Sequence, residues 1–219
     1  MTRTVAVLPV KRFGSAKQRL GENLTPGSRR ALAEAMVIDV LIALRRAQRV
    51  NAVVVVTGES SAEALAHGYG ADSAPDPDDA GHVQAAVRGI HWAVAHGAGR
   101  ALLVPGDCPA LDPKELDALL ADEPDRPEVV IVPDRHGTGT NALVLSPPEV
   151  IAPAFGPGSR ERHEQLAAEA GVACRVVEVP TLVLDIDTSE DLEALEAALA
   201  ARTGGASHTR GLLAHLGRR

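Results

Sequence analysis

Three aspartates at the ends of apolar segments are the residues best suited to chemistry. Asp107 follows the apolar run Ala101–Val104, and Asp185 and Asp187 stand at the end of a second apolar stretch. In an extended segment Asp185 and Asp187 project to the same side, because side chains alternate along a strand. Carboxylates that lie close together repel unless a cation sits between them. Asp107 is therefore a candidate ligand for Mg²⁺, which prefers oxygen ligands, and the pair Asp185 and Asp187 is a candidate metal site.

Each acid also has a structural interpretation. Asp107 can organise a turn beside Gly106, and one of the paired aspartates can cap the helix that follows them. Thr188 is already a candidate for that cap, which weakens the alternative for the pair. For Asp107 alone, the turn and the metal site remain equally good interpretations.

A basic loop of small residues follows the first apolar run, Val5–Val10. At the carboxyl end of a strand in an α/β sheet, such a loop faces the ligand crevice. Its cations and backbone N–H groups suit a polyphosphate. It matches neither G-x-x-x-x-G-K-[ST] nor G-x-G-x-x-G, so a solvated basic loop is an equal alternative from these residues alone. The candidate ligands are Lys11, Arg12, Gly14, Ser15, Lys17 and Arg19.

Two glycine-rich turns, residues 134–141 and 155–160, form a second candidate site. Glycine lets the backbone approach a ligand closely. Ser159 lies at a predicted helix start, where free N–H groups attract anions. Together the two turns predict a pocket for a small acid that carries phosphate or carboxylate. Either turn alone would be better explained as an ordinary glycine-rich turn. Its candidate ligands are Thr140, Asn141, Gly156 and Ser159.

Three other residues lie close to these segments in the sequence. Gly81 begins a predicted helix after a polar loop, and this helix start is a candidate contact for the edge of a nucleobase. We expect His136 and His163, each near a loop, to be bystanders.

Alternating apolar strands and amphipathic helices must position all of these residues. This alternation predicts an α/β fold with a mostly parallel central sheet that is covered on both faces. We predict one domain over residues 1–203, followed by a flexible basic tail at 204–219 that contains no acidic residue. Residues 72–81 are predicted as a loop, and the helix that starts at Asp112 is predicted to have a capping box with Glu115. The expected strands lie at 5–10, 50–57, 100–105, 128–133, 141–145 and 173–179, and the other helices at 26–47, 60–67, 82–96, 159–170 and 188–202.

Composition excludes several classes of protein. The 219 residues carry a net charge of −7, which argues against a nucleic-acid scaffold, and the 2% of aromatic residues argues against a base-stacking platform. No run approaches the roughly 18 apolar residues of a spanning helix. The chain start lacks the features of a signal peptide, and two cysteines are too few for a disulfide framework. We therefore expect a cytoplasmic protein that binds neither nucleic acid nor membrane.

Taken together, the motifs resemble the guanylyltransferases of coenzyme F420 biosynthesis, the 2-phospho-L-lactate or phosphoenolpyruvate guanylyltransferase family. The resemblance covers about residues 4–200. It rests on four motifs in this order: Pro9–Leu20 (PVKRFGSAKQRL), Asp134–Leu143 (DRHGTGTNAL), Phe155–Arg160 (FGPGSR) and Leu184–Thr188 (LDIDT). It implies a Rossmann-like three-layer nucleotidyltransferase fold.

The resemblance also implies a reaction, the Mg²⁺-dependent transfer of GMP from GTP to a small phosphorylated acid. Catalysis of this kind is mostly positioning and charge neutralisation. In this interpretation Lys17 and Asp107 are catalytic, the basic loop and Gly81 bind GTP, and the two glycine-rich turns bind the acid. Asp107, Asp185 and Asp187 together hold one or two Mg²⁺ ions. At Gly81 the chain has Gly-His-Val-Gln where the family pattern is Gly-Leu-Asn-Ala, so guanine selection is the weakest assignment.

The acceptor and the partners follow only from the resemblance and from composition. A composition rich in Ala, Arg and Gly suggests a bacterial source and favours phosphoenolpyruvate, with 2-phospho-L-lactate and 3-phosphoglycerate as alternatives. The downstream transferase of the pathway is a candidate partner, and both a monomer and a homodimer are open. A molybdenum-cofactor-type nucleotidyltransferase and a non-catalytic nucleotide-binding domain are the more distant alternatives.

Overall fold

The computed structural model describes residues 2–21, 24–123 and 125–216, which build a seven-stranded sheet in the order β3-β2-β1-β4-β6-β5-β7. Strand β6 is antiparallel to β4 and β5, whereas the other neighbouring strands are parallel. The predicted mostly parallel sheet is confirmed. The strands are β1 (Thr4–Val10), β2 (Ala52–Thr57), β3 (Asp72–Pro75), β4 (Arg100–Leu103), β5 (Glu128–Pro133), β6 (Thr140–Ser146) and β7 (Ala173–Val176).

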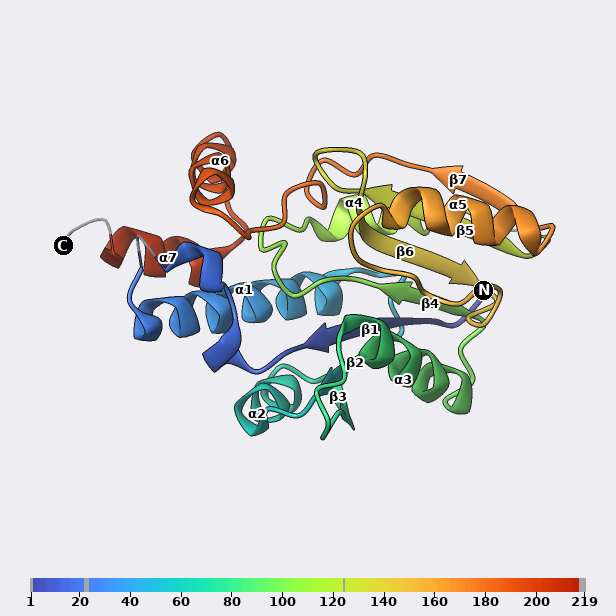
Figure 1. Ribbon diagram of the computed structural model, residues 1–219, viewed down its shortest axis with the longest axis horizontal. Helices are drawn as coiled ribbons and strands as arrows, with labels where there is room; N and C mark the ends of the chain where they lie inside the picture. Colours follow the sequence, from blue (N-terminus) through green and yellow to red (C-terminus); the bar gives the residue numbers. More distant parts are fainter. Residues whose placement is uncertain (1, 22–23, 124, 217–219) are drawn as a thin grey trace.

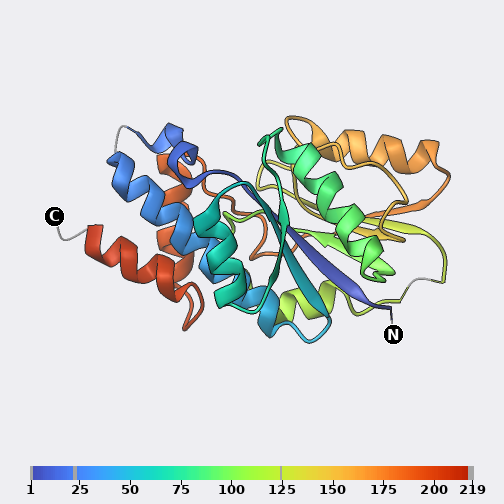
Figure 2. The same ribbon diagram turned by 90° about the horizontal axis from the view of Figure 1, so that it is seen from below.

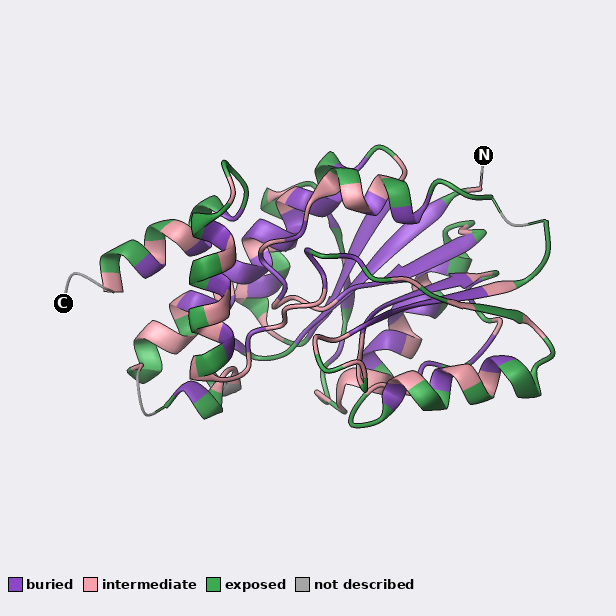
Figure 3. Cartoon of the chain, turned by 90° about the horizontal axis from the view of Figure 1, so that it is seen from above, coloured by how far each residue is buried: buried purple, intermediate pink, exposed green. Residues whose placement is uncertain are grey.

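Helices cover both faces of the sheet and form the three predicted layers (Figure 1). One apolar cluster joins a sheet face to α1 (Pro26–Arg46), α2 (Ser60–Gly68) and α4 (Pro113–Leu119). A second cluster joins the opposite face to α3 (His82–Ala95) and α5 (Ser159–Glu169). Central strands are buried on both sides, as Figure 3 shows, which explains their continuous runs of Val and Leu.

Local signals in the sequence account for several helix positions. Thr25 caps α1 by accepting a hydrogen bond from the Ser28 N–H, and Pro26 occupies the first helical position. In α3, Gly89 lies against β1: a Cβ there would be 2.1 Å from Cγ1 of Val7. Glycine therefore allows α3 to approach the sheet closely, which holds the amino end of this helix over the sheet edge where β1 ends.

The antiparallel strand β6 decides which segments meet at that edge. Its amino end lies beside the carboxyl ends of β4 and β5, since Leu103 pairs with Leu143 and Pro133 with Thr140. The β5–β6 loop, residues 134–139, consequently projects from the same edge as the loops after β1 and β4. No helix of the described residues is both long and apolar enough to cross a membrane.

Two local expectations were wrong. Residues 72–75, predicted as loop, form the edge strand β3, because backbone pairing with β2 needs no apolar side chain at these positions. Asp112 caps α4 as predicted, but the Glu115 carboxylate accepts hydrogen bonds from the backbone N–H and hydroxyl of Thr181, so the expected capping box is replaced by a tertiary contact.

The carboxyl-terminal region also differs from the expected flexible tail. The domain boundary at residue 203 remains a prediction, but Ser207–Leu216 forms helix α7, packed along α1 (Figure 2). Leu213 joins a third apolar cluster with Met36 of α1 and Leu195 of α6 (Ser189–Ala200). Residues 217–219 lie outside the described part of the chain.

A buried carboxylate of α1 fixes the start of α7. Asp39 is 4% exposed, and its Oδ1 and Oδ2 accept hydrogen bonds from the backbone N–H groups of His208 and Thr209, at 3.1 and 2.8 Å. It satisfies the free N–H groups at the start of the helix and opposes the positive end of the helix dipole. The sequence contains no local signal for this cap, because the acceptor comes from a distant helix.

We expect Asp39→Ala to lower the free energy of unfolding by about 1–3 kcal/mol, the cost of leaving buried donors without a charged acceptor. Urea unfolding followed by circular dichroism measures it, and Asp39→Asn, which keeps one acceptor oxygen, should lose less. An unfolding midpoint that is the same in Asp39→Ala and wild type would contradict the cap.

Candidate active site

A cavity of about 990 Å³ opens at the carboxyl edge of the sheet. Its walls come from the end of β1 and the basic loop, the loop after β4, the β5–β6 loop, the turn before α5 and the segment that leads into α6. Among its lining residues are predicted site residues from every one of these segments: Lys11, Lys17, Arg19, Asp107, Thr140, Asn141, Gly156, Ser159, Asp185 and Asp187.

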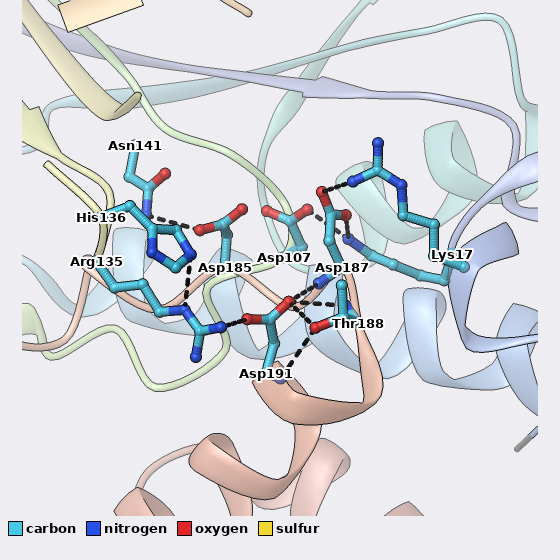
Figure 4. Close-up of polar contacts among 10 residues, drawn as sticks. Lys17, Asp107, Arg135, His136, Asn141, Asp185, Asp187, Thr188 and Asp191 are labelled. Atoms are coloured by element: carbon cyan, nitrogen blue, oxygen red, sulfur yellow. Dashed lines mark hydrogen bonds and ion pairs between the residues drawn. The ribbon is translucent and has the colours of Figure 1, made fainter. Parts of the chain in front are cut away.

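Lys17 lies at the centre of the acidic side of the cavity. Its Nζ is 2.5 Å from Oδ2 of Asp107 and 3.1 Å from Oδ1 of Asp187, and its side chain is 8% exposed (Figure 4). Burial alone would lower the pKa of Lys17, but the two carboxylates outweigh burial and raise the pKa above its ordinary value. Arg19 lies farther out, with Nη1 3.9 Å from Oδ2 of Asp187.

The backbone of Lys17 contributes to this arrangement. Lys17 has φ of 57°, in the left-handed region, and links two short 3-10 helices, Phe13–Ser15 and Gln18–Leu20. A non-glycine residue in this region is uncommon and marks a tight change of chain direction. The turn is stabilised by the burial of Phe13 and Leu20 on its two sides.

Asp185 lies beside Asp107 on the side away from Lys17 (Figure 4). Its Oδ1 accepts a hydrogen bond from Nδ2 of Asn141 at 3.2 Å, and the same nitrogen donates to the carbonyl of Leu182. Burial, and next the charge of Asp107, raise the pKa of Asp185 above its ordinary value. A nearby cation would favour the charged carboxylate and lower this pKa again.

Asp107 and Asp185 have the donor chemistry that a divalent cation requires when water and substrate oxygens complete its shell. Oδ1 of Asp107 is buried and has no hydrogen-bond partner in the described part of the structure, and Asp185 is the neighbouring carboxylate (Figure 4). Mg²⁺ is usually held by one or two carboxylates together with water and phosphate oxygens, rather than by an all-protein cage. The described residues contain no group of three or more His, Cys, Asp or Glu that could hold a metal ion by itself, so water and substrate oxygens would have to supply the other ligands.

Helix α6 fixes the loop that carries the paired aspartates. Asp191 accepts hydrogen bonds from the N–H groups of Asp187 and Thr188, and Thr188 in turn caps the helix. Burial would raise the pKa of Asp191, but these bonds, together with the Arg135 guanidinium, lower it. Nη2 of Arg135 is 2.9 Å from Oδ1 of Asp191, which ties the β5–β6 loop to the same helix.

The residues predicted to bind the small acid come from the start of β6 and from the turn before α5. Ser159 starts α5 and is 1% exposed, and Gly158 before it adopts the left-handed conformation. Arg162 of α5 stabilises this turn by donating hydrogen bonds to the backbone carbonyls of Ala154 and Pro157. Thr140 faces the turn from the start of β6. Its hydroxyl is 3.0 Å from Nδ1 of His163, which is buried and was expected to be a bystander.

The remaining predicted residues lie outside the cavity wall. Arg12, Gly14 and Gly81 are not among its described lining residues, and the side chain of Ser15 lies outside the described part of the structure. Gly81, with φ of 105°, is the residue before α3, and the next residue, His82, lines the cavity.

Arg135, Glu190 and Asp191 line the cavity but were not singled out as site residues, and His136, expected to be a bystander, lines it too. Thr138 and His82 also line it, and both belong to segments that were predicted to contact the small acid and the nucleobase. His82 packs edge-on against Phe155, with ring centroids 4.8 Å apart. Burial lowers its pKa, while Asp107 opposes that effect and Lys11 adds to it. The helix-start motif Thr188-Ser-Glu-Asp191 could have indicated the position of Asp191. His82 and Arg135 reach the cavity only through contacts between segments that are distant in the sequence.

Comparison with solved structures agrees with this architecture. A structure from Desulfovibrio desulfuricans G20, described as that of a nucleotide-diphospho-sugar transferase, aligns with a TM-score of 0.78 at 18% identity, covering 98% of this chain and 95% of that one. A nucleotidyl transferase from Methanothermobacter thermautotroptrophicus aligns with a TM-score of 0.65 at 21% identity, covering 91% and 99%. At these identities the likeness shows the fold alone.

Sequence relatives extend the likeness beyond the fold. A phosphoenolpyruvate guanylyltransferase from Conexibacter woesei is 51% identical over 97% of this chain and 96% of its own length. One from Sphaerobacter thermophilus is 40% identical, covering 88% and 92%. A 3-phospho-D-glycerate guanylyltransferase from Colwellia psychrerythraea is 34% identical, covering 88% and 91%.

The family model described as guanylyl transferase CofC like matches residues 4–217, from the first strand through helix α7. Its match includes the basic loop, the three aspartates and the turn before α5. The chain therefore belongs to the CofC-like guanylyltransferase family and is a nucleotidyltransferase.

Proposed function

We propose that this protein transfers GMP from GTP to phosphoenolpyruvate, forming enolpyruvyl-diphospho-5′-guanosine and pyrophosphate, as a step of coenzyme F420 biosynthesis. The observation that carries the proposal is one cavity lined by the basic loop, by the three aspartates and by the glycine-rich turn before α5. The relatives named for phosphoenolpyruvate support this acceptor, and the one named for 3-phospho-D-glycerate provides the alternative.

In this mechanism the basic loop binds the triphosphate. Lys11, Lys17 and Arg19 line the cavity, and their charges neutralise the phosphates and the pyrophosphate that leaves. Lys17 is held between two carboxylates in the free protein, so its ammonium group is already in position when the triphosphate arrives. Arg12, Gly14, Ser15 and Gly81 remain predicted contacts of GTP at the margin of the cavity.

Four other lining residues would orient the attacking group. Thr140, Asn141, Gly156 and Ser159 would hold the phosphorylated acid so that one of its phosphate oxygens faces the α-phosphorus of GTP. That oxygen forms a bond to the α-phosphorus while the bond to the β-phosphate oxygen breaks and pyrophosphate leaves. The reaction needs no covalent intermediate on the protein, so its rate depends on orientation and charge neutralisation.

Asp107, Asp185 and Asp187 would hold Mg²⁺ in this proposal. When bound, the ion would supply charge neutralisation at the α-phosphate. The chain's own contribution is to keep three carboxylates at one edge of the sheet, with Lys17 balancing part of their charge. Cytoplasmic location, a monomeric or dimeric state and delivery of the product to the next transferase remain predictions.

Pyrophosphate release tests the proposed function directly. Each of the four nucleoside triphosphates is combined with phosphoenolpyruvate, 2-phospho-L-lactate or 3-phosphoglycerate in the presence of Mg²⁺. We expect the highest kcat/KM with GTP and phosphoenolpyruvate. Faster turnover of another acid would reassign the acceptor, and no release with GTP and any of the three acids would refute the function.

Removing either charge that faces Lys17 should stop the reaction. We expect Asp107→Asn and Asp187→Asn each to lower kcat at least about 100-fold, because electrostatic stabilisation of the α-phosphate is lost, with unchanged circular dichroism. Asp72→Asn, an exposed substitution on the edge strand β3, is the matched control and should keep wild-type turnover. Full activity of both cavity variants would remove these acids from the metal site.

Ser159→Ala should affect the two substrates unequally. Loss of a hydroxyl donor to an anion costs about tenfold in binding, so the KM for the small acid should rise by about that factor while the KM for GTP changes less than twofold. Initial rates with each substrate varied in turn give both constants. Equal changes in the two KM values would show that the turn before α5 is not the acceptor site.

A further inference from the structure

His163 uses both ring nitrogens in hydrogen bonds that link three separate segments. Its Nε2 lies 2.8 Å from the backbone nitrogen of Ala154, and its Nδ1 lies 3.0 Å from Oγ1 of Thr140. The residue is 0% exposed. It therefore connects α5 to the turn before that helix and to the start of β6.

The first of these bonds determines where the proton lies on the imidazole. A backbone N–H can only donate, so Nε2 must accept with its lone pair, and the ring proton must then be on Nδ1. Nδ1–H consequently donates to the hydroxyl oxygen of Thr140. Because that oxygen is accepting from His163, the hydroxyl hydrogen of Thr140 points elsewhere, and Thr140 lines the cavity.

We propose that His163 is a positioning residue for the acceptor site: as a neutral Nδ1–H donor, it turns the Thr140 hydroxyl into a donor directed at the small acid. This inference rests on the proposed function. Ser159 and His163 are four residues apart and lie on the same face of α5. In this proposal both residues serve the acceptor site.

The surroundings of the ring keep it neutral and in place. Burial, and secondarily the Arg162 guanidinium, lower the pKa of His163 to about 4. Phe155 packs edge-on against the His163 ring, with ring centroids 5.3 Å apart. Phe155 also packs edge-on against His82. An imidazolium at this position would direct a second N–H at the N–H of Ala154, so the neutral form is the one that this geometry stabilises.

A purely structural role is the competing explanation, in which His163 only anchors the turn at Ala154. Two amide variants separate the two roles. In His163→Asn the amide nitrogen can replace Nδ1 and donate to Thr140, but nothing reaches Ala154. In His163→Gln the longer side chain can accept from Ala154, but the donor to Thr140 is lost.

We expect His163→Gln to raise the KM for phosphoenolpyruvate about tenfold, with the KM for GTP within twofold of wild type, and His163→Asn to stay within threefold for both. His91→Asn, on the exposed surface of α3, is the control for a histidine substitution. In a Thr140→Val background, His163→Gln should add less than twofold. The reverse order of the Asn and Gln variants, or an undiminished effect of His163→Gln in the Thr140→Val background, would overturn the inference.

Nitrogen-15 NMR of the imidazole gives a readout that does not depend on activity. In the wild-type protein at pH 7 we expect His163 to be neutral, with its proton on Nδ1. A proton on Nε2, or on both nitrogens, would overturn the inference even in an active enzyme. Absence of turnover in the wild-type protein with every acid would instead refute the proposed function and leave the tautomer to be decided by this spectrum.

Discussion

The charge balance among Lys17 and three aspartates is the constraint on which the site depends. Asp107, Asp185 and Asp187 come from two loops far apart in the sequence, and bringing them together costs free energy unless a positive charge is present. Lys17 supplies that charge from a third segment, with its Nζ in contact with two of the acids. Among the described residues, Oδ1 of Asp107 has no hydrogen-bond partner and the charge of Asp107 raises the pKa of Asp185, so these two carboxylates are where the proposed metal ion would bind.

The fold contributes by bringing these segments to one edge. Parallel strands β1 and β4 deliver the basic loop and Asp107, and the single reversal at β6 places Thr140 and Asn141 at the same edge instead of the opposite one. Asp191 and Arg135 then tie the loop of the paired aspartates to the β5–β6 loop. The two walls of the cavity are thus held by hydrogen bonds and ion pairs that are present before any substrate binds.

Much of this arrangement could be predicted from the sequence. Apolar runs and caps such as Thr25-Pro26 located nearly all of the helices and strands, because burial and capping act locally. The motifs also identified most of the residues that line the cavity. Features that depend on distant partners were missed: β3 relies on pairing with β2, Asp39 caps a helix about 170 residues away in sequence, and Glu115 contacts Thr181. His163 was dismissed for the same reason, because only the tertiary structure brings Thr140 and Ala154 to its ring.

The most direct measurement of the charge balance is the thermal unfolding of Lys17→Met with and without Mg²⁺. This substitution keeps most of the apolar stem and removes the ammonium group. If the acids need a counter-charge, Lys17→Met should unfold at a lower temperature than wild type in the absence of divalent ions, and Mg²⁺ should raise its Tm by more than it raises that of wild type. Lys114→Met, at an exposed position of α4 that is not among the lining residues of the cavity, should show neither change. An equal Mg²⁺-induced Tm shift in Lys17→Met and wild type would contradict the account.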